Sequence, residues 1–420
     1  MRNRIQLHNG NSLEVLDLYP DNSIDCIVCD PPYGISFMGK DWDKALPPVE
    51  IWEKCFKKLK PGGYILAMSA TRTYHRLGVQ LEDLGFIVHP MIGWIFGSGF
   101  PKSVDLSKQF DKQAGAKRKV VGKQKLAGTA ATLKGKPNRK DWTDQGEGGT
   151  YTPEINITAP ATALAKKWDG WKYGLQSLKP ALEPIFMGQK PHLKPMTENV
   201  KKYGVGAVNV DACRVKSKEN LGRKVVKSES NVFDSLNKKG TGSQDDKHKL
   251  GRFPANVIHD GSPDVIAEFP NTKGGSFPVQ RGAGVNTSFG EGQPTPGGAR
   301  QLNDEGSAAR FFYTAKPSKK ERDLGMDGEE IKEVDTRDPV AKGYARTPAP
   351  AKNNHPTVKP VKLMEYLIKL VCPPNGTVLD PFMGSGTTGM AAKKLKRKFI
   401  GIELSTDFFE IAKKRIKAVK

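Results

Sequence analysis

The sequence predicts an α/β fold in which helices cover a mostly parallel sheet. Between Ile24 and about Gly99, short β-rich apolar runs alternate with segments of helical periodicity, as in strands joined by crossover helices. A second alternation of helix and strand begins at Pro360. Because a chain of 420 residues exceeds what one hydrophobic core usually supports, we expect two or more structural units.

The first stretch is expected to contain three strands and two helices. They are a buried strand at 24–29, a helix from Pro47-Pro48 to Leu59, a strand at 64–68, a helix carrying Leu77, Leu81 and Leu84, and a strand at 86–96. Proline suits the first helical turn because its missing N–H would be unpaired there, and Pro61-Gly62-Gly63 ends the helix.

The C-terminal stretch is expected to alternate in the same way. Its elements are a helix at 360–371, a strand at 377–380, a Gly-rich turn, a helix through Met390 to Leu395, a strand at 399–403 and a final helix from about Thr406. The apolar residues of 360–371 recur at helical spacing. The order that follows is that of a β-turn-α-β unit.

The charge balance indicates a polyanionic partner. Lysine and arginine total 67 against 45 aspartate and glutamate, a formal net charge of +22 at pH 7, which makes nucleic acid the leading partner. No run approaches the roughly 20 apolar residues of a membrane-spanning helix, and no apolar signal region follows Met1. Five cysteines without a disulfide framework favour a reducing compartment. We therefore expect a cytoplasmic protein.

Two polar regions interrupt the α/β pattern. Residues 101–140 contain 12 Lys/Arg against 2 Asp/Glu and few large apolar residues, so this basic insertion is not expected to bury a core of its own. Lys117-Arg118-Lys119 and the basic residues of 134–140 are expected to contact phosphates without reading sequence. A second region, from about 195 to 350, is rich in Gly, Pro and Ser. Its apolar islands at 253–258 and 311–315 are expected to fold onto other parts of the protein.

The first chemical motif is Asp30-Pro31-Pro32-Tyr33, directly after the strand at 24–29. Ligands of parallel α/β sheets bind outside the carboxyl ends of the strands. Asp30 can accept a hydrogen bond from an exocyclic amine, the prolines stiffen the loop and leave carbonyls free to accept, and Tyr33 offers a face for stacking. The motif therefore suits an amine on a flat ring, with a Pro-Pro turn of no chemical role as the alternative.

The second motif spans Leu379 to Thr388, at a strand-to-helix turn, with Glu403 at the end of the next strand. Glycines let a ligand approach the backbone, and an acid about 20 positions on is placed to bind ribose hydroxyls. The turn lacks the lysine of a phosphate loop. Its expected ligand is a nucleoside with little phosphate, and the alternative is a tight turn beside a solvated glutamate.

Together the two motifs resemble those of the DNA amino-methyltransferases, which transfer a methyl group from S-adenosylmethionine to the exocyclic nitrogen of adenine or cytosine. The family's catalytic motif [DNS]-PP-[YFW] is matched at 30–33, and its donor motif F-x-G-x-G at 382–386. The catalytic motif comes first, which is the order of the class called beta. The resemblance implies a Rossmann-like methyltransferase fold with a mostly parallel seven-stranded sheet and an inserted target-recognition region.

The resemblance also implies the site residues, with no metal among the ligands. The catalytic residues would be Asp30, Pro31, Pro32 and Tyr33. Those expected to bind S-adenosylmethionine are Asn11, Asp30, Thr357, Lys359, Asp380, Phe382, Gly384, Ser385, Gly386, Thr387 and Glu403. Thr357 and Lys359 would approach the methionine end of the donor, with Lys359 pairing with its carboxylate. Asn11 stands where the family usually has aspartate, so a charge is lost while an amide oxygen remains to accept.

By this resemblance the chain divides into five stretches. They are the catalytic part of the core at 1–105, a basic insertion at 106–165, an edge strand of the core at 166–195, a target-recognition and DNA-binding region at 196–349, and the donor-binding part at 350–420. Leu178 to Pro184 resembles a strand that pairs antiparallel with the one carrying Trp94 at the sheet edge. Candidates for base readout are Arg214, Arg252, Arg281 and Arg300.

The resemblance implies double-stranded DNA as the substrate, with the target base extruded into the pocket. Asp30 and the Pro31 carbonyl would accept the amine's two N–H bonds and bring its nitrogen towards a nucleophilic state. Aspartate at the first motif position favours adenine N6, and cytosine N4 is the alternative. Methylation at cytosine C5 is excluded because it needs a thiolate after a proline, and none of the five cysteines follows one.

Two other classes of function are alternatives to a methyltransferase. A catalytically inactive DNA-binding protein is disfavoured by the intact motifs at 30–33 and 382–386. A fused nuclease would need an acidic-acidic-lysine cluster, and Pro263-Asp264 with Glu268 lacks the lysine pattern. His259, beside Asp260, is expected to be a structural residue. A cognate restriction endonuclease is a candidate partner, while the recognition sequence and oligomeric state are left open.

Overall fold

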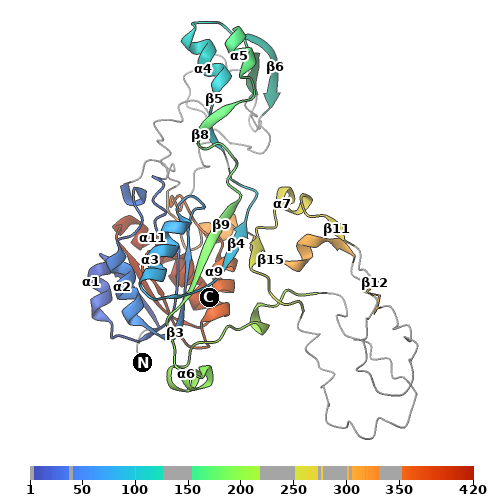
Figure 1. Cartoon of the computed structure of the whole chain (residues 1–420). Helices are drawn as coiled ribbons and strands as arrows, with labels where there is room; N and C mark the ends of the chain where they lie inside the picture. Colours follow the sequence, from blue (N-terminus) through green and yellow to red (C-terminus); the bar gives the residue numbers. More distant parts are fainter. Residues whose placement is uncertain are drawn as a thin grey trace, which may run out of the picture. The chain divides into compact units, whose positions relative to one another are not determined.

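The fold is described from a computed structural model of the chain (Figure 1). The structure describes residues 4–36, 41–99, 101–125, 154–217, 251–272, 276–277, 300–301, 305–316, 318–330 and 352–420. These residues fall into two compact units. The larger unit comprises the described residues of 1–98, 181–332 and 352–420, and the smaller unit comprises those of 99–180.

The larger unit is built on a nine-stranded sheet with the order β1-β17-β16-β2-β3-β9-β4-β10-β15. Its strands are β1 (Ile5–Asn9), β2 (Ile24–Cys29), β3 (Leu59–Met68), β4 (Ile87–Ile95), β9 (Leu182–Gln189), β10 (Val257–His259), β15 (Tyr313–Thr314), β16 (Thr377–Asp380) and β17 (Lys398–Glu403). Within this sheet, β9 runs antiparallel to both neighbours and the other pairs are parallel. The expected mostly parallel α/β sheet is therefore confirmed.

Two short strands extend the expected seven-stranded sheet to nine. β10 pairs with β4, with Ile258 opposite Trp94, and β15 pairs with β10. Both strands come from the apolar islands at 253–258 and 311–315. The prediction that these islands fold onto other parts of the protein is confirmed, because they cover the open edge of β4.

β9 lies inside the sheet, although it was expected at the edge. It pairs antiparallel with β3 on one side and, as predicted, with β4 on the other, where Trp94 lies opposite Glu183. Every residue from Pro184 to Gln189 is buried, because alternate side chains enter the cores on the two faces of the sheet, Ile185 and Met187 on one and Phe186 on the other. Since β9 runs against its neighbours, its first residues lie at the same sheet edge as their carboxyl ends.

Helices cover both faces of the sheet (Figure 1). On one face α1 (Ser12–Val15), α2 (Val49–Lys58) and α3 (Tyr74–Asp83) pack against a core that contains Ile27 and Cys29 of β2. On the other face α9 (Val361–Val371), α10 (Thr387–Lys394) and α11 (Thr406–Ala418) pack with Cys26 and Val28. Alternate residues of β2 enter the two cores, as the strand period of two requires.

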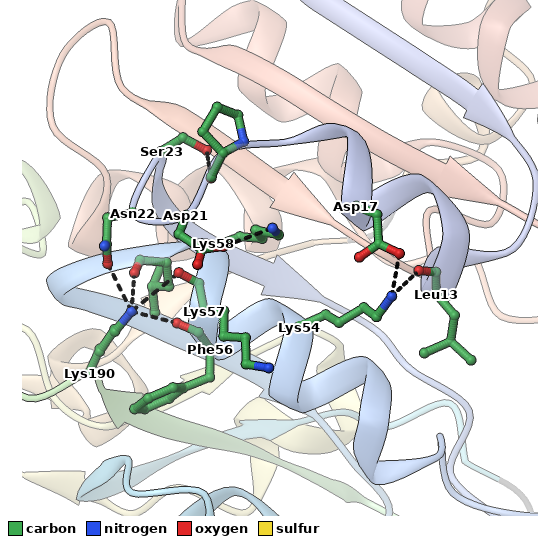
Figure 2. A network of polar contacts seen from close by, with 12 residues as sticks. Leu13, Asp17, Asp21, Asn22, Ser23, Lys54, Phe56, Lys57, Lys58 and Lys190 are labelled. Carbon is green, nitrogen blue, oxygen red and sulfur yellow. Dashed lines mark hydrogen bonds and ion pairs between the residues drawn. The ribbon is translucent and has the colours of Figure 1, made fainter.

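A network of lysines fastens α2 to the amino ends of β2 and β3 (Figure 2). The Lys190 ammonium, directly after β9, donates to the carbonyls of Phe56 and Leu59, both at 2.7 Å, and to Asn22 Oδ1 at 3.0 Å. A cation at the carboxyl end of a helix satisfies its last carbonyls and complements its dipole. Lys58 pairs with Asp21 at 2.8 Å. These bonds lie away from the carboxyl ends of the strands. They hold α2 against the sheet.

The smaller unit contains two antiparallel strand pairs and two helices. β5 (Lys102–Asp105) pairs with β8 (Lys172–Gln176), and β6 (Lys119–Lys125) pairs with β7 (Glu154–Ala159). The helices are α4 (Leu106–Gln113) and α5 (Ala163–Lys167). Part of the basic insertion therefore has regular structure, although its composition predicted no core.

A buried ion pair organises this smaller unit. Asp111 on α4 is 1% exposed and accepts from Arg118 at 2.6 Å, from the amides of Ala161 and Thr162, and from the Thr162 hydroxyl. Arg118 also donates to the Thr158 side chain at 3.0 Å and to its carbonyl at 3.1 Å. Although burial alone would raise it, these hydrogen bonds lower the pKa of Asp111 to about 2.

The hydrogen bonds of Arg118 correct one part of the prediction that Lys117, Arg118 and Lys119 contact phosphates. Arg118 is held by Asp111 and Thr158 and so is not presented to a phosphate. Lys117 and Lys119 on either side of it are exposed. The predicted basic residues of 134–140 lie outside the described residues.

The five cysteines are free and buried. Burial raises the pKa of the thiols of Cys26, Cys29 and Cys55. They therefore act as small apolar core residues, as expected. In the ranges that the structure describes, no helix is both long and apolar enough to cross a membrane.

Candidate active site

The two predicted motifs meet at one edge of the sheet. Asp30 follows β2, Asp380 closes β16 and Glu403 closes β17. β16 and β2 are neighbours, with Leu379 opposite Ile27, so the loops that follow them start side by side. Parallel strands end at the same edge, and adjacent strands whose loops diverge form the usual ligand site of such sheets.

Asp30 lies in a polar cluster with Tyr33 and Lys359. Its Oδ1 accepts from the Tyr33 hydroxyl at 2.6 Å, and its Oδ2 pairs with Lys359 Nζ at 2.7 Å. Nζ also lies 5.3 Å from the centroid of the Tyr33 ring. Lys359 was predicted to pair with the donor's carboxylate, whereas here it is 8% exposed and its partners are protein carboxylates.

Glu183 completes this cluster and was not predicted as a site residue. Its Oε2 accepts from the Tyr33 hydroxyl at 3.2 Å and lies 3.3 Å from Lys359 Nζ. Burial raises the pKa of Glu183, and the charge of Lys359 opposes that rise. Although burial alone would lower it, Asp30 and Glu183 raise the pKa of Lys359, which stays charged. The sequence feature that could have identified Glu183 is that it is the single acidic residue in the otherwise mostly apolar strand segment 182–189.

Asp43 fixes the loop that carries the catalytic motif, and it too was not predicted. It is 1% exposed, and its Oδ1 accepts from the backbone amides of Tyr33 at 2.5 Å and Gly34 at 3.1 Å. Gly34 has φ of 66°, a conformation that favours glycine. Pro31 is buried and Pro32 is half-buried. The backbone of the motif is therefore held by hydrogen bonds within the protein.

Glu403 holds the Gly-rich turn after β16. Its Oε2 accepts from the Gly384 amide at 2.7 Å and its Oε1 from the Ser405 amide at 2.8 Å. Burial raises the pKa of Glu403, and these amide bonds oppose the shift. A carboxylate oxygen with one such bond keeps a lone pair for another donor. Glu403 can therefore build the turn and still accept from a ligand.

The two glycines of the turn are required by backbone and by space. Gly384 and Gly386 have φ of 53° and 82°. A Cβ on Gly384 would lie 2.8 Å from His355 Nε2, and one on Gly386 would lie 2.8 Å from the Ala412 Cβ. They were expected to let a ligand approach the backbone, and the structure adds close packing against the protein itself. Burial lowers the pKa of His355 to about 3, so it is neutral here.

A buried arginine supports the turn from behind and was not predicted. Arg415 on α11 is fully buried. It donates to the Ser385 carbonyl, to the Ser385 hydroxyl at 3.0 Å and to the Thr387 hydroxyl at 3.3 Å. Ser385 and Thr387 were predicted to bind the methyl donor; in the structure their hydroxyls accept from Arg415, and both residues are less than one tenth exposed.

Asp380 and Phe382 shape the turn from inside. Asp380 is 2% exposed and its Oδ1 accepts from the Phe382 amide at 3.0 Å. Burial raises the pKa of Asp380 to about 7. The Phe382 ring packs edge-on against Trp52 of α2, with centroids 5.4 Å apart. Asp380 and Phe382 therefore lie at the Gly-rich turn, as predicted from the sequence, and both stabilise its conformation.

The remaining predicted donor ligands lie on flanking loops. Asn11 is exposed and caps α1, because its Oδ1 accepts from the Leu13 amide at 3.0 Å. The adjacent Ser12 donates to the Pro381 carbonyl at 2.6 Å and so ties the loop after β1 to the Gly-rich turn. Thr357 is half-buried and its amide donates to His355 Nδ1 at 3.3 Å.

Of the four arginines predicted for base readout, the structure describes the side chains of two, Arg214 and Arg252. Arg214 pairs with Asp211 at 2.8 Å and lies over the Phe253 ring at 4.0 Å. Arg252 lies 5.0 Å from the centroid of Phe311. Arg281 and the side chain of Arg300 are outside the described residues.

His259 has the structural role expected of it. Its Nδ1 accepts from the Gly261 amide at 3.1 Å, and its Nε2 lies 3.2 Å from the Thr314 hydroxyl. Among the residues that the structure describes, no group of three or more His, Cys, Asp or Glu side chains is arranged to hold a metal ion.

Comparison with known proteins identifies relatives by sequence. A DNA methylase family model matches residues 176–414. The type II methyltransferase M2.LlaDCHI of Lactococcus lactis subsp. cremoris is 42% identical over 90 residues, which are 21% of this chain and 32% of that protein. M2.DpnII of Streptococcus pneumoniae is 48% identical over 64 residues, 15% of this chain and 24% of that protein. The chain thus spans about a third or less of these curated relatives.

Two solved structures align over nearly the whole chain. PvuII DNA methyltransferase, described as cytosine-N4-specific, is 14% identical with a TM-score of 0.41, over 98% of this chain and 88% of that one. The M1.HpyAVI complex is 16% identical with a TM-score of 0.36, over 98% and 99%. The family model, which covers more than half of the chain and contains both the donor motif and Glu403, decides the assignment. The chain belongs to the DNA methylase family, whose methyl donor is S-adenosylmethionine.

Proposed function

We propose that the protein is a site-specific DNA methyltransferase that methylates N6 of adenine in duplex DNA by base flipping. The observation that carries the proposal is the pairing of β16 with β2, which starts the loop of Asp30 beside the Gly-rich turn. An amine acceptor and a nucleoside-binding turn then flank one site. S-adenosylmethionine, when bound, supplies a methyl group on a positively charged sulfur.

In this proposal Asp30 and the Pro31 carbonyl accept the two N–H bonds of the target amine. This brings the nitrogen lone pair out of conjugation with the ring and aligns it with the methyl group. The Asp30 carboxylate has lone pairs beyond those used by Tyr33 and Lys359, so it can accept a further bond. The Tyr33 ring offers the flipped base a stacking face. Glu403 and the Gly384–Gly386 turn hold the nucleoside part of the donor.

Adenine N6 is proposed over cytosine N4 because the catalytic motif begins with Asp30 instead of serine. Both amines present two N–H donors beside a ring nitrogen, so the polar geometry accommodates either. Cytosine N4 is therefore the alternative, and the product decides between them.

Duplex DNA incubated with the enzyme and isotope-labelled S-adenosylmethionine should yield labelled N6-methyladenine after digestion. Mass spectrometry of the nucleosides measures N6-methyladenine, N4-methylcytosine and C5-methylcytosine in one run. The protein with Asp30→Ala serves as the blank. N4-methylcytosine as the main product would replace adenine by the alternative, and no labelled nucleoside at all would contradict the proposed activity.

We also propose double-stranded DNA as the partner of the basic segments. The type II methyltransferases that share sequence with this chain support a cognate restriction endonuclease as a second partner. Target recognition is assigned to 196–349, and phosphate contact to the exposed lysines of the smaller unit.

Replacing both Lys117 and Lys119 by glutamine should weaken DNA binding and its dependence on salt. Each phosphate contact contributes about 0.9 to the slope of log K against log salt, so the slope should fall by about that much per lysine. Fluorescence anisotropy with a labelled duplex at several salt concentrations measures this. Lys413→Gln, on the surface of α11, is the matched control. An unchanged slope would show that these lysines are merely solvated.

A further inference from the structure

Two carboxylates share one lysine in the cluster around Asp30. Lys359 Nζ lies 2.7 Å from Asp30 Oδ2 and 3.3 Å from Glu183 Oε2. The Tyr33 hydroxyl bridges the same two side chains, at 2.6 Å from Asp30 and 3.2 Å from Glu183. The carboxylates come from different strands, Asp30 from the end of β2 and Glu183 from the start of β9. The antiparallel direction of β9 is what brings Glu183 to this edge.

Lys359 alone would neutralise Asp30. A carboxylate bound to an ammonium at 2.7 Å is a neutral pair and a weaker acceptor than a free carboxylate. With Glu183 ionised, the cluster carries one net negative charge. Asp30 and Glu183 are about one fifth exposed and Lys359 is almost fully buried, so solvent screens this charge less than it would at the surface.

The proposed reaction places positive charge where this cluster lies. The amine nitrogen forms a bond to the methyl carbon while the carbon–sulfur bond breaks, and the bonding pair stays on sulfur. The charge thereby moves from sulfur to the nitrogen, which Asp30 faces. A proton then leaves the nitrogen to the Asp30 carboxylate, and the nitrogen lone pair returns to the ring. A net negative site stabilises the cation better than a neutral one.

We propose that Glu183 is a positioning residue that supplies the second negative charge of this site, so that Asp30 remains a strong acceptor while bound to Lys359. The inference rests on the proposed methyl transfer. Glu183 also fixes the Tyr33 hydroxyl and the Lys359 ammonium in place. Its role is therefore to set charge and geometry at Asp30 without touching the base.

Glu183→Gln should lower the single-turnover rate of methyl transfer about tenfold at saturating donor and DNA, with donor affinity little changed. Glutamine keeps the shape and one acceptor but removes the charge. Glu82→Gln, at an exposed glutamate on α3, is the matched control. Thermal unfolding of each variant separates loss of fold from loss of rate. A Glu183→Gln rate within twofold of the wild-type rate would overturn the inference.

A double variant distinguishes charge from structure. Glu183→Gln leaves the cluster neutral, whereas Glu183→Gln combined with Lys359→Gln restores one net negative charge. We therefore expect the double variant to react several times faster than Glu183→Gln alone when donor is saturating. If Glu183 served only to pack the site, removing a second member would lower the rate further, and that result would contradict the charge role.

The pH profile gives an independent readout. The groups that face Glu183 in the cluster are Asp30, Tyr33 and Lys359. Because burial raises the pKa of Glu183, its charge should be lost as pH falls through a value above the usual glutamate range. The wild-type single-turnover rate should fall there, and Glu183→Gln should lack that limb. The same limb in both proteins would contradict the inference, whereas absence of transfer in the wild type would contradict the proposed function itself.

Discussion

Asp30→Ala should reduce methyl transfer about a thousandfold while S-adenosylmethionine still binds. The substitution removes the acceptor of the target amine and leaves the Lys359 ammonium with Glu183 as its remaining carboxylate partner in the cluster. Donor binding should persist because the Gly-rich turn after β16 and Glu403 at the end of β17 are not altered by the substitution. A tritiated-methyl transfer assay measures the rate, and calorimetry on the same protein measures donor binding.

Two further variants make this result specific. Asp30→Asn keeps an oxygen for the Tyr33 hydroxyl, so it tests the loss of charge with less change in packing. Asp41→Ala removes a carboxylate that is 89% exposed and pairs with Lys44, and it should leave the rate unchanged. Transfer near the wild-type rate in Asp30→Ala would remove Asp30 from the proposed mechanism.

Glu403→Ala should weaken donor binding tenfold or more, with a smaller loss of turnover once donor is saturating. A hydrogen bond to a charged group contributes about 1.5 to 3 kcal/mol, which corresponds to that loss of affinity. The Gly384 and Ser405 amides would also lose their acceptor, so the turn itself should loosen. Titration calorimetry with S-adenosylmethionine measures the dissociation constant.

The matched control for Glu403 is Glu410→Ala, which removes a surface glutamate of α11 paired with Lys413. Surface pairs of this kind contribute about 0 to 1 kcal/mol to stability, so binding should be unaffected. A dissociation constant that stays the same in Glu403→Ala would reduce Glu403 to a support of the turn.

The elements next to the two motifs were predictable because their signals are local. The buried run 24–29 and the helical stripe of 360–371 became β2 and α9 within one residue. β1 was not foreseen, because the alternation of apolar Ile5 and Leu7 with polar Gln6 and His8 spans only four residues. It forms through pairing with β17, residue by residue from Ile5 with Phe399 to Asn9 with Glu403. The periodicity of a short segment does not indicate which distant strand it will pair with.

The unforeseen site residues share one physical cause. Asp43 and Glu183 are acids whose burial and partners depend on tertiary structure. Asp43 lies in a charged loop where solvation would be the ordinary expectation, and Glu183 reaches the site because β9 lies inside the sheet and runs backwards. Arg415 is likewise a core residue that composition would place on a helix surface.

The smaller unit shows the limit of counting apolar residues. Few large apolar side chains were found in its first segment, and a core was not expected there. Asp111 and Arg118 form a polar core there. Each carboxylate oxygen of Asp111 accepts from two donors. A satisfied polar network can organise a small unit, and its members are not marked in sequence.

The pairing of β2 with β16 has a consequence for the order of synthesis on the ribosome. The Thr377 amide donates to the Asp25 carboxylate at 2.6 Å across 352 residues, and β16 pairs with β2 beside that bond. The Asp30 motif is therefore translated before β16, and one edge of β2 stays without its native strand until β16 follows. A nascent chain stopped before β16 would carry the catalytic motif but lack the turn that faces it. The site proposed for methyl transfer is thus assembled only after β16 and the turn that follows it have been translated.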